Sequence, residues 1–232
     1  MIRKYLLFAF ILCFFVRCQS DTKSASSTKT TTTTAKTANQ SPNKKPVREK
    51  PKTILFFGDS LTAGYGLEKK QAYPALIQEK LQESELKYSV INAGVSGETS
   101  AGGLRRVDWI LKNEIDIFVL ELGGNDGLRG IDPAETLKNL QGIIDKVQEQ
   151  SPKTKIVLAG MEAPPNMGDD FTAKFRKNYQ TLAANNEVTL IPFLLEKVAG
   201  IASLNLEDGI HPNVEGHKLL TETVWGYLKP IL

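Results

Sequence analysis

The feature that most limits the fold of this chain is a regular alternation, from residue 53 onward, of short apolar runs with longer amphipathic stretches. Five runs rich in branched and aromatic side chains are predicted to be strands: residues 53–57, 88–91, 117–120, 156–158 and 188–191. Several of them are continuously apolar, which is typical of parallel strands that are covered on both faces. The alternation predicts an α/β fold, a three-layer α/β/α sandwich around a five-stranded parallel sheet with right-handed crossovers.

The stretches between these runs carry helix signals. Asp132, Pro133 and Glu135 supply an N-cap, a first-turn proline and a capping-box acid, and an apolar face follows them at helical spacing. Residues 73–86 and 171–185 show a similar pattern, and Pro212 is expected to open a final helix. No internal repeat is apparent, so residues 53–232 are predicted to form one domain.

Residues 1–18 have the pattern of an export signal: basic side chains at the start, then an apolar run over residues 5–16. This run is shorter than the ~20 residues that a membrane-spanning helix needs. Cys18 directly follows it and resembles the acylated cysteine of a bacterial lipobox, although Arg17 departs from the usual pattern. The alternatives are an uncleaved or differently cleaved signal and an anchor helix. We expect export to the periplasm or cell surface, with a lipid anchor at Cys18 in a bacterial membrane.

Residues 19–52 are predicted to be a disordered tether. They contain 13 serines and threonines among 34 residues, together with lysines and prolines, and only Val47 is an aliphatic residue larger than alanine. Such a segment lacks the apolar side chains for a core of its own. As a flexible coil it would hold the domain roughly 30 Å from its anchor.

Charge is unevenly distributed along the chain. The net charge is +3, but the leader contributes three basic groups without an acid, and the tether eight basic groups against two acids, which leaves −6 for residues 53–232. The basic balance therefore belongs to the N-terminal segments, and no nucleic acid partner is expected. The only cysteines, Cys13 and Cys18, lie in the leader, so we expect neither a disulfide nor thiol chemistry in the domain.

Polar, glycine-containing segments follow the first three predicted strands directly. They are residues 58–61 (GDSL), 92–99 (NAGVSGET) and 123–127 (GGNDG). Ligands of parallel α/β sheets bind beyond the carboxyl ends of the strands. The topology therefore brings these three segments to one edge of the sheet.

A serine nucleophile needs a base, and the chain has two histidines. His211 follows Asp208 by three residues, close enough along a turn for the carboxylate to hold the imidazole. His217 falls inside the last predicted helix, where packing or a solvated face is the ordinary role. A metal site made from Asp208, His211, Glu215 and His217 is disfavoured because its two imidazoles point to different places, and no cofactor signature is present.

The blocks Gly58-Asp59-Ser60-Leu61, Gly97, Gly123-Gly124-Asn125-Asp126 and Asp208-x-x-His211 closely resemble, in this order, those of the SGNH (GDSL) hydrolase superfamily. The longer strings 58–66 (GDSLTAGYG), 121–130 (ELGGNDGLRG) and 208–213 (DGIHPN) are similar to its bacterial arylesterase, acyl-CoA thioesterase I and lysophospholipase branch. The resemblance covers residues 53–232 and implies a flavodoxin-like sandwich. No Gly-x-Ser-x-Gly elbow is present, which disfavours an α/β-hydrolase.

The resemblance implies a serine esterase or thioesterase without a cofactor or metal, whose substrates are acyl esters such as aryl esters, acyl thioesters and lysophospholipids. Ser60 would be the nucleophile, His211 the general base and acid, and Asp208 the residue that orients it. The oxyanion hole would combine the backbone N–H groups of Ser60 and Gly97 with the side-chain amide of Asn125. Alternatives are a carbohydrate or cell-wall O-acetyl esterase and a surface-binding lipoprotein without activity.

Further residues of these segments have expected roles beside the chemistry. Asp59 is expected to be a structural turn residue, Asp126 to cap or brace its loop, and the adjoining glycines to form a tight turn. Residues 126–131 fit either a mobile lid or an ordinary loop. Residues 161–167, rich in apolar side chains and prolines, are placed to line an acyl pocket.

Overall fold

A computed structural model describes residues 50–232, in which five parallel strands form one sheet. The strand order is β2-β1-β3-β4-β5. The strands are β1 (Lys52–Gly58), β2 (Tyr88–Asn92), β3 (Ile117–Glu121), β4 (Lys155–Ala159) and β5 (Thr189–Ile191). The predicted fold class is confirmed, and each strand end lies within one residue of its predicted position. The predicted leader and tether lie outside the described residues, except for residues 50–52, and the first strand begins at Lys52.

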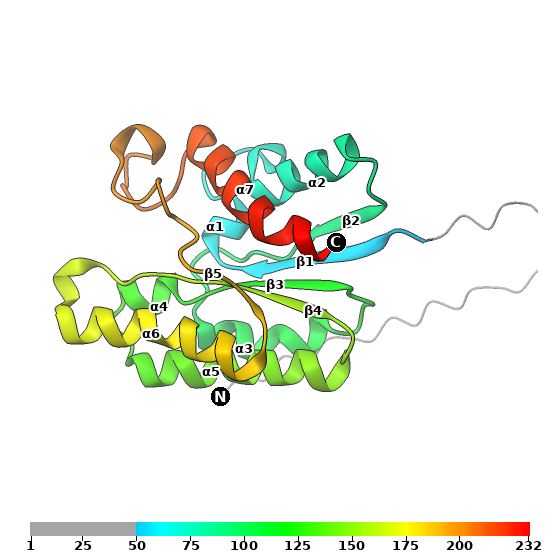
Figure 1. Cartoon of the computed structure of the whole chain (residues 1–232). Helices are drawn as coiled ribbons and strands as arrows, with labels where there is room; N and C mark the ends of the chain where they lie inside the picture. The colour runs from blue at the N-terminus through cyan, green and yellow to red at the C-terminus, as the bar shows by residue number, and fades with distance from the viewer. Residues whose placement is uncertain (1–49) are drawn as a thin grey trace, which may run out of the picture. The chain divides into compact units, whose positions relative to one another are not determined.

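Helices cover both faces of the sheet (Figure 1). On one face α2 (Tyr73–Glu83) packs against α7 (Val214–Leu228). On the other face α3 (Ser100–Ile110), α5 (Pro133–Gln150) and α6 (Asp169–Asn186) pack side by side. Short helical segments complete the fold: α1 (Ser60–Ala63), α4 (Gly124–Leu128), η1 (Lys69–Gln71), η2 (Pro165–Met167), η3 (Ala202–Leu204) and η4 (Lys229–Ile231).

The core lies on both sides of the central strands. All five residues of β3 are buried, and Phe56 and Phe57 of β1 are buried although neighbouring strand residues point to opposite faces. Phe56 meets Tyr73 of α2 edge-on, whereas Phe57 contacts Phe118. Burial of both faces explains the continuous apolar runs, because no face of these strands is left to water.

The last helix differs from the prediction that Pro212 opens it. Helix α7 begins at Val214, and Asn213 is its N-cap, whose side-chain oxygen accepts from the N–H groups of Glu215 and Gly216. Pro212 instead pairs with Asn205 in an isolated antiparallel bridge. The cap competes successfully with the proline because it satisfies two N–H groups that the first turn leaves free.

Helix α2 is shorter than predicted, and three helices were not predicted. It ends at Glu83, before Glu85 takes up a positive φ of 54°. Helices α1, α3 and α4 arise within or beside the polar, glycine-containing segments that follow the first three strands. Within residues 50–232, no helix combines the length and the apolar character needed to cross a membrane.

Candidate active site

Ser60 is the first residue of α1, directly after β1. The preceding Asp59 is the N-cap of this helix and accepts from the N–H of Leu61 at 3.0 Å. Gly58 is needed for the close approach of strand and helix, because a Cβ there would collide with the Thr62 hydroxyl and the Glu121 carboxyl group. The Gly-Asp-Ser sequence therefore makes a tight strand-to-helix turn with the serine at its outer end.

His211 connects Ser60 to Asp208. Its Nε2 lies 2.9 Å from the Ser60 Oγ, and its Nδ1 lies 2.7 Å from the Asp208 Oδ2. The other oxygen of Asp208 accepts from the backbone N–H groups of Ile210 and His211, both at 3.0 Å, which fixes the turn. Burial acts to raise the pKa of Asp208, but the hydrogen bonds from the His211 ring and from these two N–H groups lower it below its ordinary 3.8. Asp208 therefore remains an acceptor for the imidazole.

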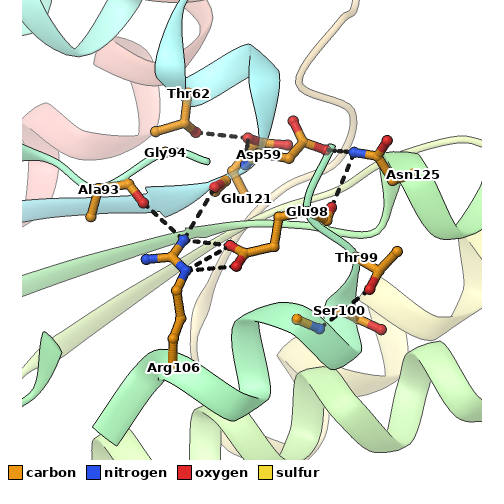
Figure 2. Close-up of polar contacts among 12 residues, drawn as sticks. Asp59, Thr62, Ala93, Gly94, Glu98, Thr99, Ser100, Arg106, Glu121 and Asn125 are labelled. Atoms are coloured by element: carbon orange, nitrogen blue, oxygen red, sulfur yellow. Dashed lines mark hydrogen bonds and ion pairs between the residues drawn. The ribbon is translucent and has the colours of Figure 1, made fainter. Parts of the chain in front are cut away.

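Gly97 approaches Ser60 from the loop after β2, and Asn125 approaches it from α4; all three residues line the same cavity. Gly97 has a φ of +78°, a conformation that favours glycine. The Asn125 amide, on α4, donates to Asp59 Oδ2 at 2.9 Å and to the Glu98 carbonyl oxygen at 3.0 Å (Figure 2). Within residues 50–232, no hydrogen-bond partner is found for the backbone N–H of Ser60 or of Gly97. The structure thus brings together every residue that the resemblance assigned to the triad and the oxyanion hole.

A carboxyl group that the sequence reasoning missed lies behind this turn. Glu121, at the end of β3, is fully buried, and its Oε2 accepts from the Asp59 N–H at 3.1 Å and the Thr62 hydroxyl at 2.7 Å. Burial, and then the charge of Asp59, raise the pKa of Glu121 well above its ordinary 4.5. Burial also raises the pKa of Asp59 to about 6, against the hydrogen bonds from Leu61 and Asn125. An acidic residue closing an otherwise apolar strand was the available signal for Glu121.

Asp126 ties three helices together. From α4 it accepts from the N–H of Ser100 at 2.9 Å and from two hydroxyls, that of Ser100 at the start of α3 and that of Thr136 in the first turn of α5. It therefore braces its surroundings, as expected. Gly123 makes the expected turn with a φ of +113°, and a Cβ there would collide with the Tyr179 hydroxyl. Residues 126–128 are helical rather than a free loop, and residues 129–132 lead into α5.

His217 has a packing role. It is buried in α7, and its Nδ1 accepts from the backbone N–H of Tyr73 at 3.1 Å. Burial lowers its pKa from 6.5 to about 4. Among the described residues, no group of three or more histidine, cysteine, aspartate or glutamate side chains is placed to hold a metal ion.

A cavity of about 640 Å³ opens beside Ser60 and His211. Its walls are mainly apolar, and the segment 161–167, expected to line an acyl pocket, contributes to them from after β4. The lining includes Leu128, Met161, Ala163, Pro165, Phe193 and Ile210. A nucleophile at the edge of an apolar cavity of this size suits a substrate with a hydrocarbon part.

Comparison with known proteins gives concordant matches. The model of the GDSL-like lipase/acylhydrolase family matches residues 56–219. Esterase TesA of Pseudomonas aeruginosa is 41% identical over 181 residues, which are 78% of this chain and 89% of that protein. Thioesterase 1/protease 1/lysophospholipase L1 of Escherichia coli is 38% identical, over 78% of this chain and 85% of that protein. A crystal structure of TesA superposes with a TM-score of 0.75, covering 78% of this chain and all of the other.

Proposed function

This chain belongs to the GDSL-like lipase/acylhydrolase family and is a serine hydrolase of ester bonds, and we propose that it works through an acyl-enzyme on Ser60. The observation that carries this proposal is the hydrogen-bonded series Ser60–His211–Asp208, with separations of 2.9 and 2.7 Å, at the edge of an apolar cavity. A nucleophile, its base and the group that orients the base are the parts that acyl transfer needs.

In the proposed mechanism His211 Nε2 takes the proton of the Ser60 hydroxyl as its Oγ attacks the acyl carbon. Asp208 holds the Nδ1 proton and stabilises the imidazolium that forms. His211 then gives the proton to the leaving alcohol or thiol. Water, activated by the same imidazole, hydrolyses the acyl-enzyme and restores the free serine.

The oxyanion would be held by the backbone N–H groups of Ser60 and Gly97 together with the Asn125 amide. This amide donates to the carboxyl of Asp59 and to the Glu98 carbonyl. A neutral substrate carbonyl competes weakly for these hydrogens, whereas an oxyanion competes strongly. The amide would therefore stabilise the transition state more than the bound ester, which is the condition for a gain in rate.

We propose acyl esters and thioesters with a hydrocarbon chain as the substrate class, lysophospholipids included. The apolar lining of the cavity supports this, and so do the names of the relatives, which are an esterase and a thioesterase/lysophospholipase. Each methylene that moves from water into such a cavity contributes about 0.8 kcal/mol. A chain of medium length should therefore be preferred to acetate.

Initial rates on the nitrophenyl esters of acetate, octanoate and palmitate, for the wild type and Ser60→Ala, test this proposal. We expect kcat/KM on octanoate to exceed that on acetate at least ~10-fold, and Ser60→Ala to lower kcat ~10⁶-fold. Palmitoyl thioesters and lysophosphatidylcholine then define the natural class. A preference for acetate, or for O-acetylated glycans, would favour the acetyl-esterase alternative, and absence of any turnover would favour a binding lipoprotein.

We further propose that the domain is exported and anchored to a bacterial membrane through a lipid on Cys18. The apolar run over residues 5–16 and the Ser/Thr-rich segment after the cysteine support this from the sequence. Metabolic labelling with a palmitate analogue tests it. Cys18→Ser should abolish the label and release activity from the membrane fraction, whereas Cys13→Ser should leave both unchanged; equal labelling of the two variants would refute the anchor.

A further inference from the structure

We propose that Arg106 is a positioning residue, which holds the loop of residues 92–99 so that the Gly97 N–H and the Asn125 amide converge on the oxyanion. Arg106 lies on α3, and its side chain is 23% exposed to solvent. The substrate cavity is lined by Gly97 and Asn125 but not by Arg106. The inference rests on the proposed function, since it concerns the same oxyanion hole.

Arg106 contacts the loop at both of its ends. Its Nε donates to the two carboxylate oxygens of Glu98 at 2.7 and 2.9 Å, and its Nη2 also contacts this carboxylate. The same Nη2 donates to the carbonyl of Ala93 at 2.8 Å (Figure 2) and to that of Gly58 at 3.4 Å. One guanidinium therefore links the beginning of the loop, its end and the strand end that leads to Ser60.

The guanidinium and its partner are themselves held in place. The Arg106 guanidinium carbon lies 3.9 Å from the centre of the Phe57 ring, and the Glu98 side chain is only 8% exposed. Gly102 leaves room for this carboxylate arm, because a Cβ there would lie 2.9 Å from the Glu98 Cγ. A largely buried, bidentate pair of this kind fixes geometry better than an exposed ion pair does.

Glu98 transmits this constraint to the oxyanion donors by two routes. Its backbone follows Gly97, so fixing Glu98 fixes the peptide beside the Gly97 N–H. Its carbonyl accepts from the Asn125 amide at 3.0 Å, so it also sets the orientation of that side chain. Oxyanion donors act over separations of about 2.7–3.1 Å, and a displacement of about 1 Å costs ~10²-fold in rate.

The variants Arg106→Gln, Arg106→Lys and Glu98→Gln test this role, with Arg105→Gln as the matched control. Arg105 is the exposed neighbour on α3, and its substitution removes the same charge. We expect Arg106→Gln to lower kcat about 10-fold to 100-fold while KM changes by less than about threefold, because the loss falls on the transition state. Arg106→Lys should recover part of the lost kcat, since lysine keeps the positive charge but lacks the bidentate donors of the guanidinium. Rates are expressed per serine titrated by a nitrophenyl phosphonate, so that misfolded molecules do not count.

Two further measurements separate positioning from general stability. In the Asn125→Ala background, Arg106→Gln should lower kcat much less than it does in the wild type, because both substitutions act on the same oxyanion hole. Amide hydrogen exchange over residues 92–99 should rise in Arg106→Gln and not in Arg105→Gln. An unchanged kcat per titrated serine, or additive effects with Asn125→Ala, would overturn the inference.

Hydrogen exchange also keeps this inference distinct from the proposed function. If the wild type hydrolysed no ester, the proposed function would fail. Hydrogen exchange would then still test whether Arg106 holds the loop, and unchanged protection of residues 92–99 in Arg106→Gln would refute that role.

Discussion

Replacing Glu121 by glutamine should change how the stability of the domain depends on pH. Glutamine has the same shape as a protonated glutamate, and its oxygen can accept from the Asp59 N–H and the Thr62 hydroxyl as Oε2 does now. Its nitrogen would occupy the place of Oε1, a buried oxygen without a hydrogen-bond partner among the described residues. The substitution therefore removes an ionisable group with little change in packing.

The sign of the effect follows from the raised pKa. Burial and the neighbouring Asp59 keep the Glu121 proton in the folded protein, whereas the unfolded chain releases it near the ordinary value of 4.5. Above this pH, folding must take up a proton. The free energy of unfolding then falls by about 1.4 kcal/mol per pH unit until the folded carboxyl ionises. The glutamine variant lacks this dependence, so its advantage over the wild type should grow with pH above 4.5 until the folded carboxyl ionises.

Urea unfolding of residues 50–232, followed by circular dichroism at several pH values above 4.5 and at constant ionic strength, measures the difference. Glu114→Gln is the matched control. Its hydrogen bond and charge interaction with Lys50 lower the pKa of Glu114 below its ordinary 4.5, so this carboxylate is ionised throughout the range, and the curve of Glu114→Gln should run parallel to that of the wild type. If the Glu121→Gln curve is also parallel, Glu121 does not retain its proton in the fold and the reasoning is wrong.

Other substitutions probe single contacts. Asn125→Ala should lower kcat by ~10²–10³ with a small change in KM, measured on the octanoate ester, because it removes a proposed oxyanion donor. His217→Asn should make the stability of the domain less sensitive to acid. Burial lowers the pKa of the His217 ring from 6.5 to about 4, so the free energy of unfolding of the wild type falls by up to about 3 kcal/mol as pH falls through that range. Urea unfolding at each pH shows whether the variant loses less. Gly123→Ala should lower the Tm in a thermal melt, since φ is +113° and the methyl group meets the Tyr179 hydroxyl; an unchanged Tm would show that the turn relaxes freely.

Elements with strong local signals were predictable from the sequence. The central strands are apolar on both faces because helices cover both faces, and α5 begins at the predicted cap, where Asp132 accepts from the Ala134 N–H at 2.9 Å. Helix α3 gave no such signal, since two glycines near its start lower helix propensity. Tertiary contacts explain why glycine is needed at these two positions. A Cβ at Gly103 would collide with Leu122, and a Cβ at Gly102 would crowd Glu98. Packing overrides propensity here, and a single sequence does not reveal it.

Within the site too, some residues are predictable from local sequence signals and others only from tertiary contacts. Residues proposed to touch the substrate follow strands of a parallel sheet, within short glycine-containing segments, so their order along the chain leaves a recognisable pattern. Glu121 and Arg106 act over longer separations, on the turn that carries Ser60 and on the loop that carries Gly97. An acid at the end of an apolar strand is only a weak signal, and an arginine on a helix has no local signature. Their significance arises only when folding removes one from water and places the other between two loop ends, and for that reason they require the structure to be found.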